Sequence, residues 1–174
     1  GDWKSFLQYK VHYVGKATKQ NIVKRLTGHS KLQDILTLET PVTENQLPAN
    51  EIVILTFEFQ DNIQILNLGQ KADKEDIAAT IRGEHYPSQE KVFLDAEKAL
   101  VRAMQPEYNK VLFENYPISK DGLYNDNYNA VSYTLTDPIV LKYKNGIIRG
   151  GLSDIGGDAI IILDNKEFKL IKHE

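Results

Sequence analysis

The stretch that decides how this chain is interpreted is residues 11–29, VHYVGKATKQNIVKRLTGH. Residues 9–14, which include the start of this stretch, alternate between apolar and polar side chains and contain β-branched residues. This pattern predicts a strand that ends at Gly15. A short polar turn leads into a predicted helix that carries Arg25 and His29. Because these two residues are four positions apart, their side chains project from the same face of the helix. A glycine turn followed by an arginine and a histidine on one face favours the binding of a phosphate group.

Residues 89–104 show the clearest helical periodicity in the chain, and Ser88 is the predicted N-cap. The apolar side chains of this helix share one arc, and Glu97 falls at the edge of that arc. The opposite arc, predicted to face solvent, holds Lys91, Asp95, Lys98 and Arg102. A carboxylate on the buried side of a helix must be paired, protonated or bound to a metal ion. The helix ends before a proline, and Asn109 follows in a turn.

The remaining elements are short and are separated by polar turns. Residues 51–60 give the strongest strand prediction, with residues 63–68 as a hairpin partner, and helices are predicted over 31–38 and 73–82. Five further strands are predicted over 131–135, 139–143, 147–149, 159–163 and 168–171. The sequence thus predicts an α/β (α+β) fold with a small, mainly antiparallel central sheet flanked by helices and a C-terminal β-rich extension.

The predicted domain organisation has three parts. Residues 1–112 form the main domain, residues 113–130 a linker of loop composition, and residues 131–174 a small β-meander. The β-meander either packs on the main domain or stands as its own module. It could serve as a specificity element, as a homodimer surface or as a contact within a larger protein.

The composition is ordinary for a soluble globular protein, with 41% hydrophobic and 26% charged residues among 174. The absence of cysteine excludes disulfide frameworks, thiolate zinc sites and cysteine nucleophiles, and it fits a cytoplasmic protein. No apolar run is long enough to span a bilayer, and the first residues lack a signal-peptide pattern. The four histidines show no paired spacing of the kind zinc ligands have, which argues against a zinc site.

Positive charge is concentrated in the first part of the chain. Residues 1–35 contain seven basic and two acidic residues, a net charge of +5 in a chain whose total is −3. A basic end on an acidic chain is suited to face phosphates, and Lys16, Lys19 and Lys24 are the candidate contacts. On charge alone, a solvated lysine-rich surface is the simpler interpretation.

The chemically suggestive residues occur in a fixed order: Tyr13-Val14-Gly15-Lys16, Arg25, His29, Glu97 and Pro106-Glu107-Tyr108-Asn109. Over about residues 9–112 this order resembles the pattern of the GIY-YIG nucleases. In that family a strand ends in Tyr-Ile/Val-Gly, an arginine lies on the next helix, and a glutamate on a later helix precedes a Pro-x-x-Asn-like ending. The family's first signature, Gly-Ile-Tyr, is not evident in this chain. Its strand lies outside this sequence, or Tyr9 takes its role, or this member has lost activity.

The resemblance implies a metal-dependent endonuclease that hydrolyses phosphodiester bonds in nucleic acid, in DNA rather than RNA. It implies that Glu97 holds one Mg²⁺ or Mn²⁺ ion and that Arg25 meets the negative charge of the transition state. Tyr13 would orient or deprotonate the attacking water, and His29 would relay the proton or contact phosphate. Asn109 would orient substrate or a ligand through its amide. The substrate contacts would be Tyr9, Lys16, Lys19 and Lys24.

Each of these residues also has an ordinary structural role that it could fill alone. A tyrosine at a strand end packs across a sheet, a helical arginine forms surface ion pairs, and a half-buried glutamate pairs with a base. Only the joint order of the residues raises the nuclease interpretation above these roles. The alternative is a catalytically inactive module with the same fold that binds nucleic acid or another protein.

Overall fold

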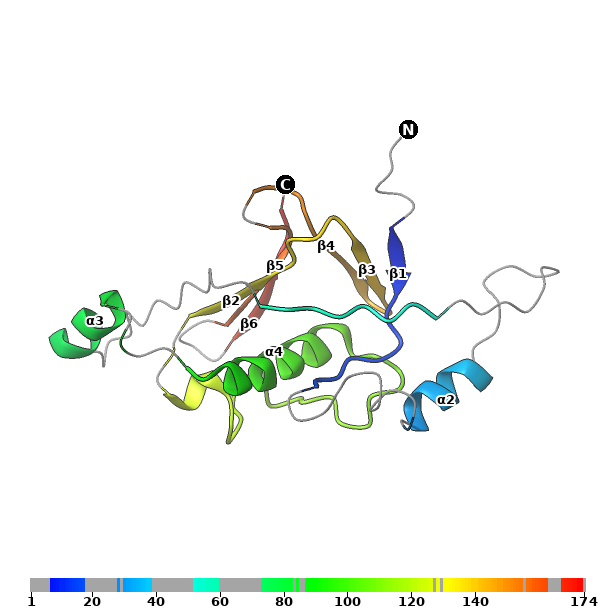
Figure 1. Cartoon of the computed structure of the whole chain (residues 1–174), viewed down its shortest axis with the longest axis horizontal. Coiled ribbons are helices and arrows are strands. Elements are labelled where there is room, and N and C mark those ends of the chain that lie inside the picture. Colours follow the sequence, from blue (N-terminus) through cyan, green and yellow to red (C-terminus); the bar gives the residue numbers. More distant parts are fainter. Residues whose placement is uncertain are drawn as a thin grey trace. The chain divides into compact units, whose positions relative to one another are not determined.

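The computed structural model describes most of the chain: residues 7–17, 28, 30–38, 52–59, 73–82, 84, 87–126, 128, 130–154, 156–162 and 167–173. The chain divides into two compact units, one made of Gly1–Lys16 with Ile63–Glu174 and the other of Ala17–Asn62. Helices are combined with two small, mostly antiparallel sheets whose strands lie mainly in the C-terminal part, so the predicted fold class is confirmed (Figure 1). No helix within the described residues is long and apolar enough to cross a membrane.

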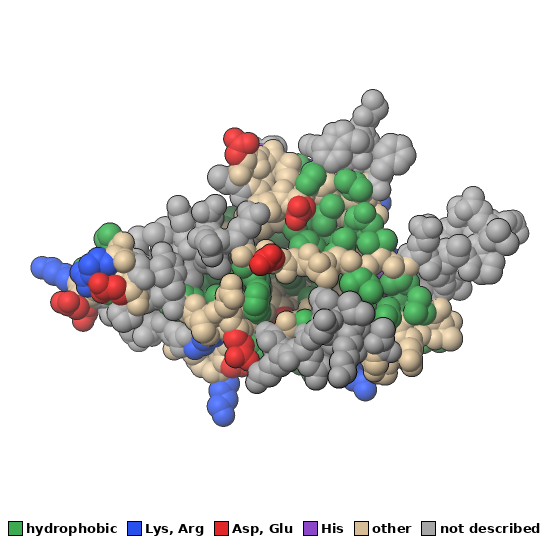
Figure 2. All heavy atoms as spheres, in the orientation of Figure 1, with side chains coloured by type: hydrophobic (Ala, Val, Ile, Leu, Met, Phe, Trp, Pro, Cys, Tyr) green, Lys and Arg blue, Asp and Glu red, His purple; other side chains and the backbone are tan. Residues whose placement is uncertain are grey.

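The first sheet joins the two sequence segments that make up the larger unit. Its order is β1-β3-β4, with β1 (Gln8–Lys10) parallel to β3 (Val140–Tyr143) and β3 antiparallel to β4 (Gly146–Arg149). Within it, Tyr9 stands opposite Leu141. On the face shown in Figure 2, hydrophobic side chains gather over the region of β3 and β4.

The second sheet is antiparallel throughout and has the order β2-β5-β6. Its strands are β2 (Val131–Thr134), β5 (Ala159–Ile162) and β6 (Phe168–Ile171). All five predicted C-terminal strands are therefore present, but they do not follow one another as a meander. The chain leaves the first sheet at Gly150 and passes so close to β4 that a Cβ on Gly157 would lie 1.9 Å from the Arg149 carbonyl oxygen. Turn signals mark such bends without telling which sheet the next strand joins.

The strand prediction over residues 51–60 is wrong for its described part, since residues 52–59 contain no strand. Among them Val53, Ile54 and Phe57 are exposed. Apolar and β-branched side chains suit a strand, but a strand also needs a hydrogen-bonded neighbour. Its predicted hairpin partner, residues 63–68, lies outside the described residues.

The helices follow their local signals closely. The predicted ranges become α2 (Ser30–Leu38), α3 (Lys74–Ile81) and α4 (Gln89–Met104). Ser88 is the N-cap of α4, and its hydroxyl oxygen accepts a hydrogen bond from the Lys91 N–H at 3.4 Å. The helix predicted near residues 21–28 lies outside the described residues, apart from Gly28.

Helix α4 is buried on two sides, which corrects the prediction that Asp95 and Lys98 face solvent. Asp95 is 0% exposed and Lys98 is 5% exposed. On the second side, Tyr116 and Leu123 of the segment predicted as a linker contact Asp95. Helix α4 also packs against β5 and the 3₁₀ helix η2 (Leu123–Asp126). A helical wheel assumes a single buried face, and α4 has two.

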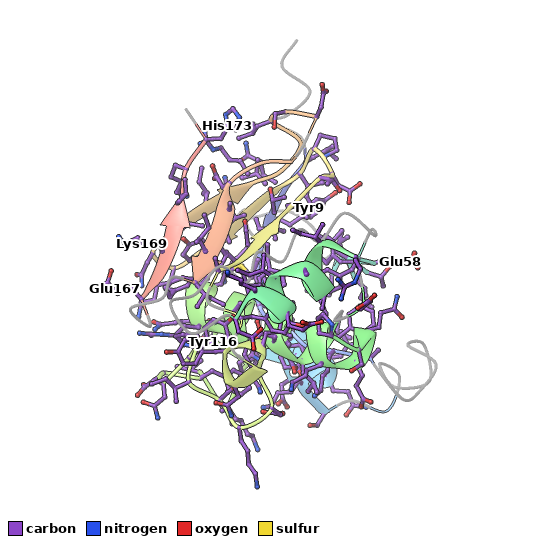
Figure 3. All side chains as sticks on the ribbon, turned by 90° about the vertical axis from the view of Figure 1, so that its left-hand side faces the viewer. Tyr9, Glu58, Tyr116, Glu167, Lys169 and His173 are labelled. Carbon is purple, nitrogen blue, oxygen red and sulfur yellow. The ribbon has the colours of Figure 1, made fainter. Side chains whose placement is uncertain are left out.

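Asp95 is the hydrogen-bonding centre of this covered side. Its carboxylate accepts hydrogen bonds from the Tyr116 hydroxyl at 2.8 Å, the Tyr133 hydroxyl at 2.6 Å and the Leu123 N–H at 3.0 Å. Figure 3 shows Tyr116 beside α4. Burial, together with the negative charge of Asp95, raises the pKa of Tyr116 and that of Tyr133 far above the ordinary tyrosine value. Both phenols therefore keep their protons and act as donors.

Candidate functional site

Asn109 joins the end of α4 to the stretch that follows β1. The Val14 N–H donates to Asn109 Oδ1 at 3.0 Å, and Asn109 Nδ2 donates to the Val14 carbonyl at 2.8 Å. The side-chain amide thus pairs with Val14 as a neighbouring strand would. One position earlier, the Tyr108 N–H donates to the His12 carbonyl at 3.2 Å, and the two rings meet edge to face with centroids 6.2 Å apart. These contacts fix together two segments that are 95 positions apart in sequence.

The turn that delivers Asn109 starts at the C-cap of α4. Gln105 adopts a left-handed conformation with φ 45°, and its N–H donates to the Val101 carbonyl at 2.8 Å. Pro106 is buried and prevents the helix from continuing. The Asn109 N–H then donates to the Pro106 carbonyl at 3.1 Å. The short sequence from residue 105 to 109 is therefore a folded turn that presents the Asn109 amide to Val14.

The ring of Tyr13 folds back over Gly15. A Cβ at residue 15 would stand 2.7 Å from Cε1 and 2.9 Å from the hydroxyl oxygen of Tyr13, closer than real Cβ contacts allow. Any residue larger than glycine would therefore displace the phenol. The glycine of the Tyr-Val-Gly sequence thus leaves room for the tyrosine ring in this position.

Lys16 connects this turn to the candidate carboxylate. Its Nζ lies 3.9 Å from Glu97 Oε2, and both side chains are mostly buried. On the next residue of α4, Lys98 Nζ donates to Ser119 Oγ at 3.2 Å and to the Asp121 carboxylate. The Lys98 hydrogen bond is the main cause of a lowered pKa of Asp121, and the charge of Lys16 adds to it. Two lysines and two carboxylates therefore form one electrostatic cluster at this side of α4.

Several predicted site residues are thus brought together, and the others lie elsewhere. The contacts unite the turn of Tyr13 and Lys16 with Glu97 and Asn109. The Asn109 amide, however, is engaged with the Val14 backbone, so its role here is to position the turn. Tyr9 is half-buried on β1. Outside the described residues lie Lys19, Lys24, Arg25 and His29.

Sequence reasoning missed Lys98 and Ser119 as neighbours of the site. Lys98 was assigned to a solvent-facing arc because its position on the wheel is opposite the apolar residues. The sequence signal for a second buried side of the helix is the aromatic-rich segment after Asn109. In the structure, Tyr116 of this segment is buried. Such a segment indicates a second buried side without identifying its residues.

The donor set limits how a metal ion could bind. Within the described residues, no group of three or more histidine, aspartate or glutamate side chains is arranged to hold a metal ion. Glu97 offers one carboxylate, and Mg²⁺ often binds through one or two carboxylates with water and substrate phosphate as the other ligands. The residues present are therefore compatible with a Mg²⁺ ion that Glu97 and a substrate phosphate would bind together.

Comparisons of the chain with protein-family models, with curated proteins and with solved structures find no match. The contacts between described residues are therefore the evidence on function. The most informative of them is the pairing of Asn109 with Val14, because it unites two motifs that the sequence holds far apart.

Replacing Asn109 with alanine is expected to loosen the turn of Tyr13 and Lys16 from α4. The change removes both hydrogen bonds to Val14 and should lower the free energy of unfolding by roughly 1–3 kcal/mol. The amide hydrogen of Val14 should exchange faster with solvent, measured by NMR hydrogen exchange. Asn125→Ala removes an exposed side-chain hydrogen bond to the Lys120 carbonyl and serves as the matched control. Unchanged exchange at Val14 would contradict the positioning role.

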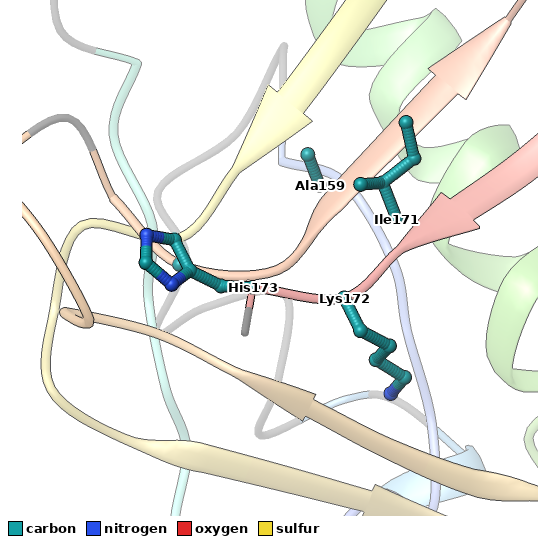
Figure 4. A pocket seen from close by; sticks show the side chains of 5 residues that line it. Ala159, Ile171, Lys172 and His173 are labelled. Carbon is teal, nitrogen blue, oxygen red and sulfur yellow. The ribbon is translucent and has the colours of Figure 1, made fainter.

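A second charged cluster lies where β6 ends. The buried Asp158 carboxylate accepts hydrogen bonds from the Arg149 guanidinium, at 2.9 and 3.2 Å, and from the N–H groups of Arg149 and His173, at 3.0 and 2.8 Å. Lys172 Nζ is 3.6 Å away. Beside it is a hollow of about 330 Å³ lined by Gly157, Ala159, Ile171, Lys172 and His173 (Figure 4). Asp158 is fully engaged within the protein, so this cluster fastens the end of β6 to β4.

Asp158 should make the fold sensitive to acid. Burial alone would raise its pKa, but the hydrogen bonds from Arg149 and the two backbone N–H groups outweigh burial and lower the pKa to about 2. A lowered folded-state pKa stabilises the fold at pH values above the ordinary aspartate value, by on the order of 2 kcal/mol, and this stabilisation is lost as the pH falls from about 4 through 2.

Thermal unfolding from pH 6 to 2 tests this expectation. The difference in stability between the parent and Asp158→Asn should shrink as the pH falls below about 4. The exposed Asp154, changed to asparagine, is the matched control and should show no such convergence. A difference that stays constant down to pH 2 would contradict the assignment.

Proposed function

We propose that this chain is a metal-dependent endonuclease of the GIY-YIG type that hydrolyses phosphodiester bonds in nucleic acid, in DNA rather than RNA. The observation that carries the proposal is the double hydrogen bond between Asn109 and Val14. It joins the Tyr-Val-Gly-Lys turn to the end of the helix that carries Glu97. The second support is the distance of 3.9 Å between Lys16 Nζ and Glu97 Oε2, which places an ammonium group beside the carboxylate.

Each residue has a role that suits its chemistry. Tyr13 orients the attacking water through its hydroxyl group, with the ring held over Gly15. Lys16 balances the charge of Glu97 in the free protein and binds a substrate phosphate. Glu97 holds the Mg²⁺ or Mn²⁺ ion, which when bound supplies polarisation of a phosphate oxygen. Arg25 and His29, outside the described residues, keep their expected roles: stabilisation of the developing negative charge by Arg25, and proton relay or phosphate contact by His29.

One observation favours a second function, a catalytically inactive module that binds nucleic acid. The Glu97 carboxylate lies beside the Lys16 ammonium, so its charge is already compensated without a cation. In such a module the basic residues of the first part of the chain would still attract phosphates. A homodimer or a larger assembly through the C-terminal strands remains a further prediction.

A cleavage assay separates the two functions. The protein is incubated with supercoiled plasmid, single-stranded DNA or RNA in Mg²⁺, in Mn²⁺ and in EDTA. The nuclease proposal expects cleavage of DNA with a metal and none in EDTA. Binding that persists in EDTA without cleavage under either metal supports the second function. A protein that neither binds nor cleaves any nucleic acid contradicts both.

A further inference from the structure

A hollow of about 510 Å³ is lined by residues that directly follow two members of the candidate site in sequence. It is lined by Lys98 of α4 and by residues 110–116, 118 and 119 of the segment that follows the helix. Lys98 comes directly after Glu97 in the chain, and Lys110 comes directly after Asn109. Both walls of the hollow therefore start one residue away from a residue of the proposed site.

The lining combines apolar side chains with an available cation. Val111 is 61% exposed and Ile118 is 53% exposed, although both lie at this hollow. Single exposed apolar residues are common, but here they line the same concave surface together with Phe113. Lys98 is engaged with Ser119 and Asp121, whereas Lys110 is exposed and can turn to an anion. Apolar and aromatic walls with an ammonium group suit a nucleotide, because the base packs on the walls and the phosphate meets the cation.

The backbone at Phe113 supports a use for its side chain. Phe113 has φ 49°, a left-handed conformation that glycine or asparagine adopts far more readily than a bulky residue. The Tyr116 N–H donates to the Phe113 carbonyl at 2.9 Å and helps to hold this conformation. A bulky residue in this conformation costs conformational energy, and such strained positions occur often at ligand-binding sites, which favours a binding role for the Phe113 ring.

We propose that this hollow receives one unstacked nucleotide of the substrate, so that the preferred substrate is single-stranded nucleic acid or a duplex with an unpaired nucleotide near the cleaved bond. This inference rests on the proposed nuclease function. The hollow has the size of a small-ligand pocket and cannot admit a duplex, so the base has to leave the helical stack before it enters. Glu114 and Asn115 of the same lining supply an acceptor and an amide of the kind that contact base edges.

The test measures binding without cleavage. Fluorescence anisotropy in EDTA compares a short labelled single-stranded DNA with a blunt duplex of the same sequence. We expect the single strand to bind about ten times more tightly, and Phe113→Leu and Lys110→Ala each to weaken its binding roughly fivefold or more, with duplex binding unchanged. Phe168→Leu on β6 and Lys144→Ala in the β3–β4 turn are the matched controls and should bind like the parent. Urea unfolding of each variant establishes that it is folded.

The outcomes distinguish this inference from the proposed function. The inference is overturned if the single strand does not bind or binds no more tightly than the duplex. It is also overturned if Phe113→Leu and Lys110→Ala are folded and bind the single strand like the parent. Metal-dependent cleavage of intact duplex in that case leaves the nuclease proposal standing. Single-strand binding that depends on Phe113 and Lys110, in a protein that never cleaves, supports the hollow as a nucleotide site and removes the nuclease proposal.

Discussion

The substitution Glu97→Gln is expected to reduce DNA cleavage by roughly a thousandfold or more. The substitution keeps the size of the side chain and removes the negative charge that would hold the cation. DNA binding should be retained or strengthened, because Lys16 loses the carboxylate that lies 3.9 Å from its ammonium group. Single-turnover cleavage in Mg²⁺ and anisotropy in EDTA measure the two quantities separately.

The matched control for this change is Glu107→Gln. Glu107 is an exposed carboxylate in the turn that follows α4, so its substitution alters charge near the site without touching Glu97. We expect its cleavage rate to stay within about twofold of the parent, in line with ordinary surface substitutions. A Glu97→Gln variant that cuts as fast as Glu107→Gln would remove Glu97 from the proposed site.

Asp95→Ala is expected to cost roughly 3–5 kcal/mol of stability, the largest effect that we predict on folding. The carboxylate is fully buried and is the acceptor for two phenol hydroxyls and one backbone N–H. Its removal leaves these three donors buried without their partner. Because Tyr116 and Leu123 belong to the segment over α4 and Tyr133 belongs to β2, two neighbouring parts of the unit lose the same anchor.

Urea unfolding of the parent and of Asp95→Ala measures this cost. Tyr116→Phe and Tyr133→Phe should each cost about 1–2 kcal/mol, and each should be coupled to Asp95 in a double-mutant cycle. Asp154→Ala, at an exposed aspartate, controls for the loss of a carboxylate. An Asp95→Ala variant within about 1 kcal/mol of the parent would show that the network contributes little to stability.

Elements with local signals could be predicted from the sequence. The extent of α4 is identified by Ser88, by the periodicity that follows it and by Pro106, since an N-cap hydroxyl, an apolar stripe and a proline are properties of neighbouring residues. The C-terminal strands were predicted for the same reason, from short alternating runs between glycine and asparagine turns. Their division between two sheets depends on contacts such as the parallel pairing of β1 with β3, which no local pattern encodes.

The sequence suggests which residues belong to one candidate site, but it does not predict how their side chains are arranged. The order of Tyr13, Glu97 and Asn109 in the chain suggested one site, and the Val14–Asn109 hydrogen bonds bring the first and last of these segments together. The Asn109 side chain hydrogen-bonds the Val14 backbone, and Lys98 is buried. Both facts depend on how segments that are distant in sequence pack together. A helical wheel and a motif contain no such information.

The most direct test of the proposed nuclease is the nicking of supercoiled plasmid in Mg²⁺ by the parent, Glu97→Gln and Arg25→Ala, assayed side by side. We expect the parent to convert the plasmid to open-circular and linear forms, and neither variant to do so. Failure of the parent to cleave plasmid or single-stranded DNA in Mg²⁺ or Mn²⁺, or equal nicking by all three proteins, would contradict a nuclease site built from the Tyr13–Lys16 turn and α4.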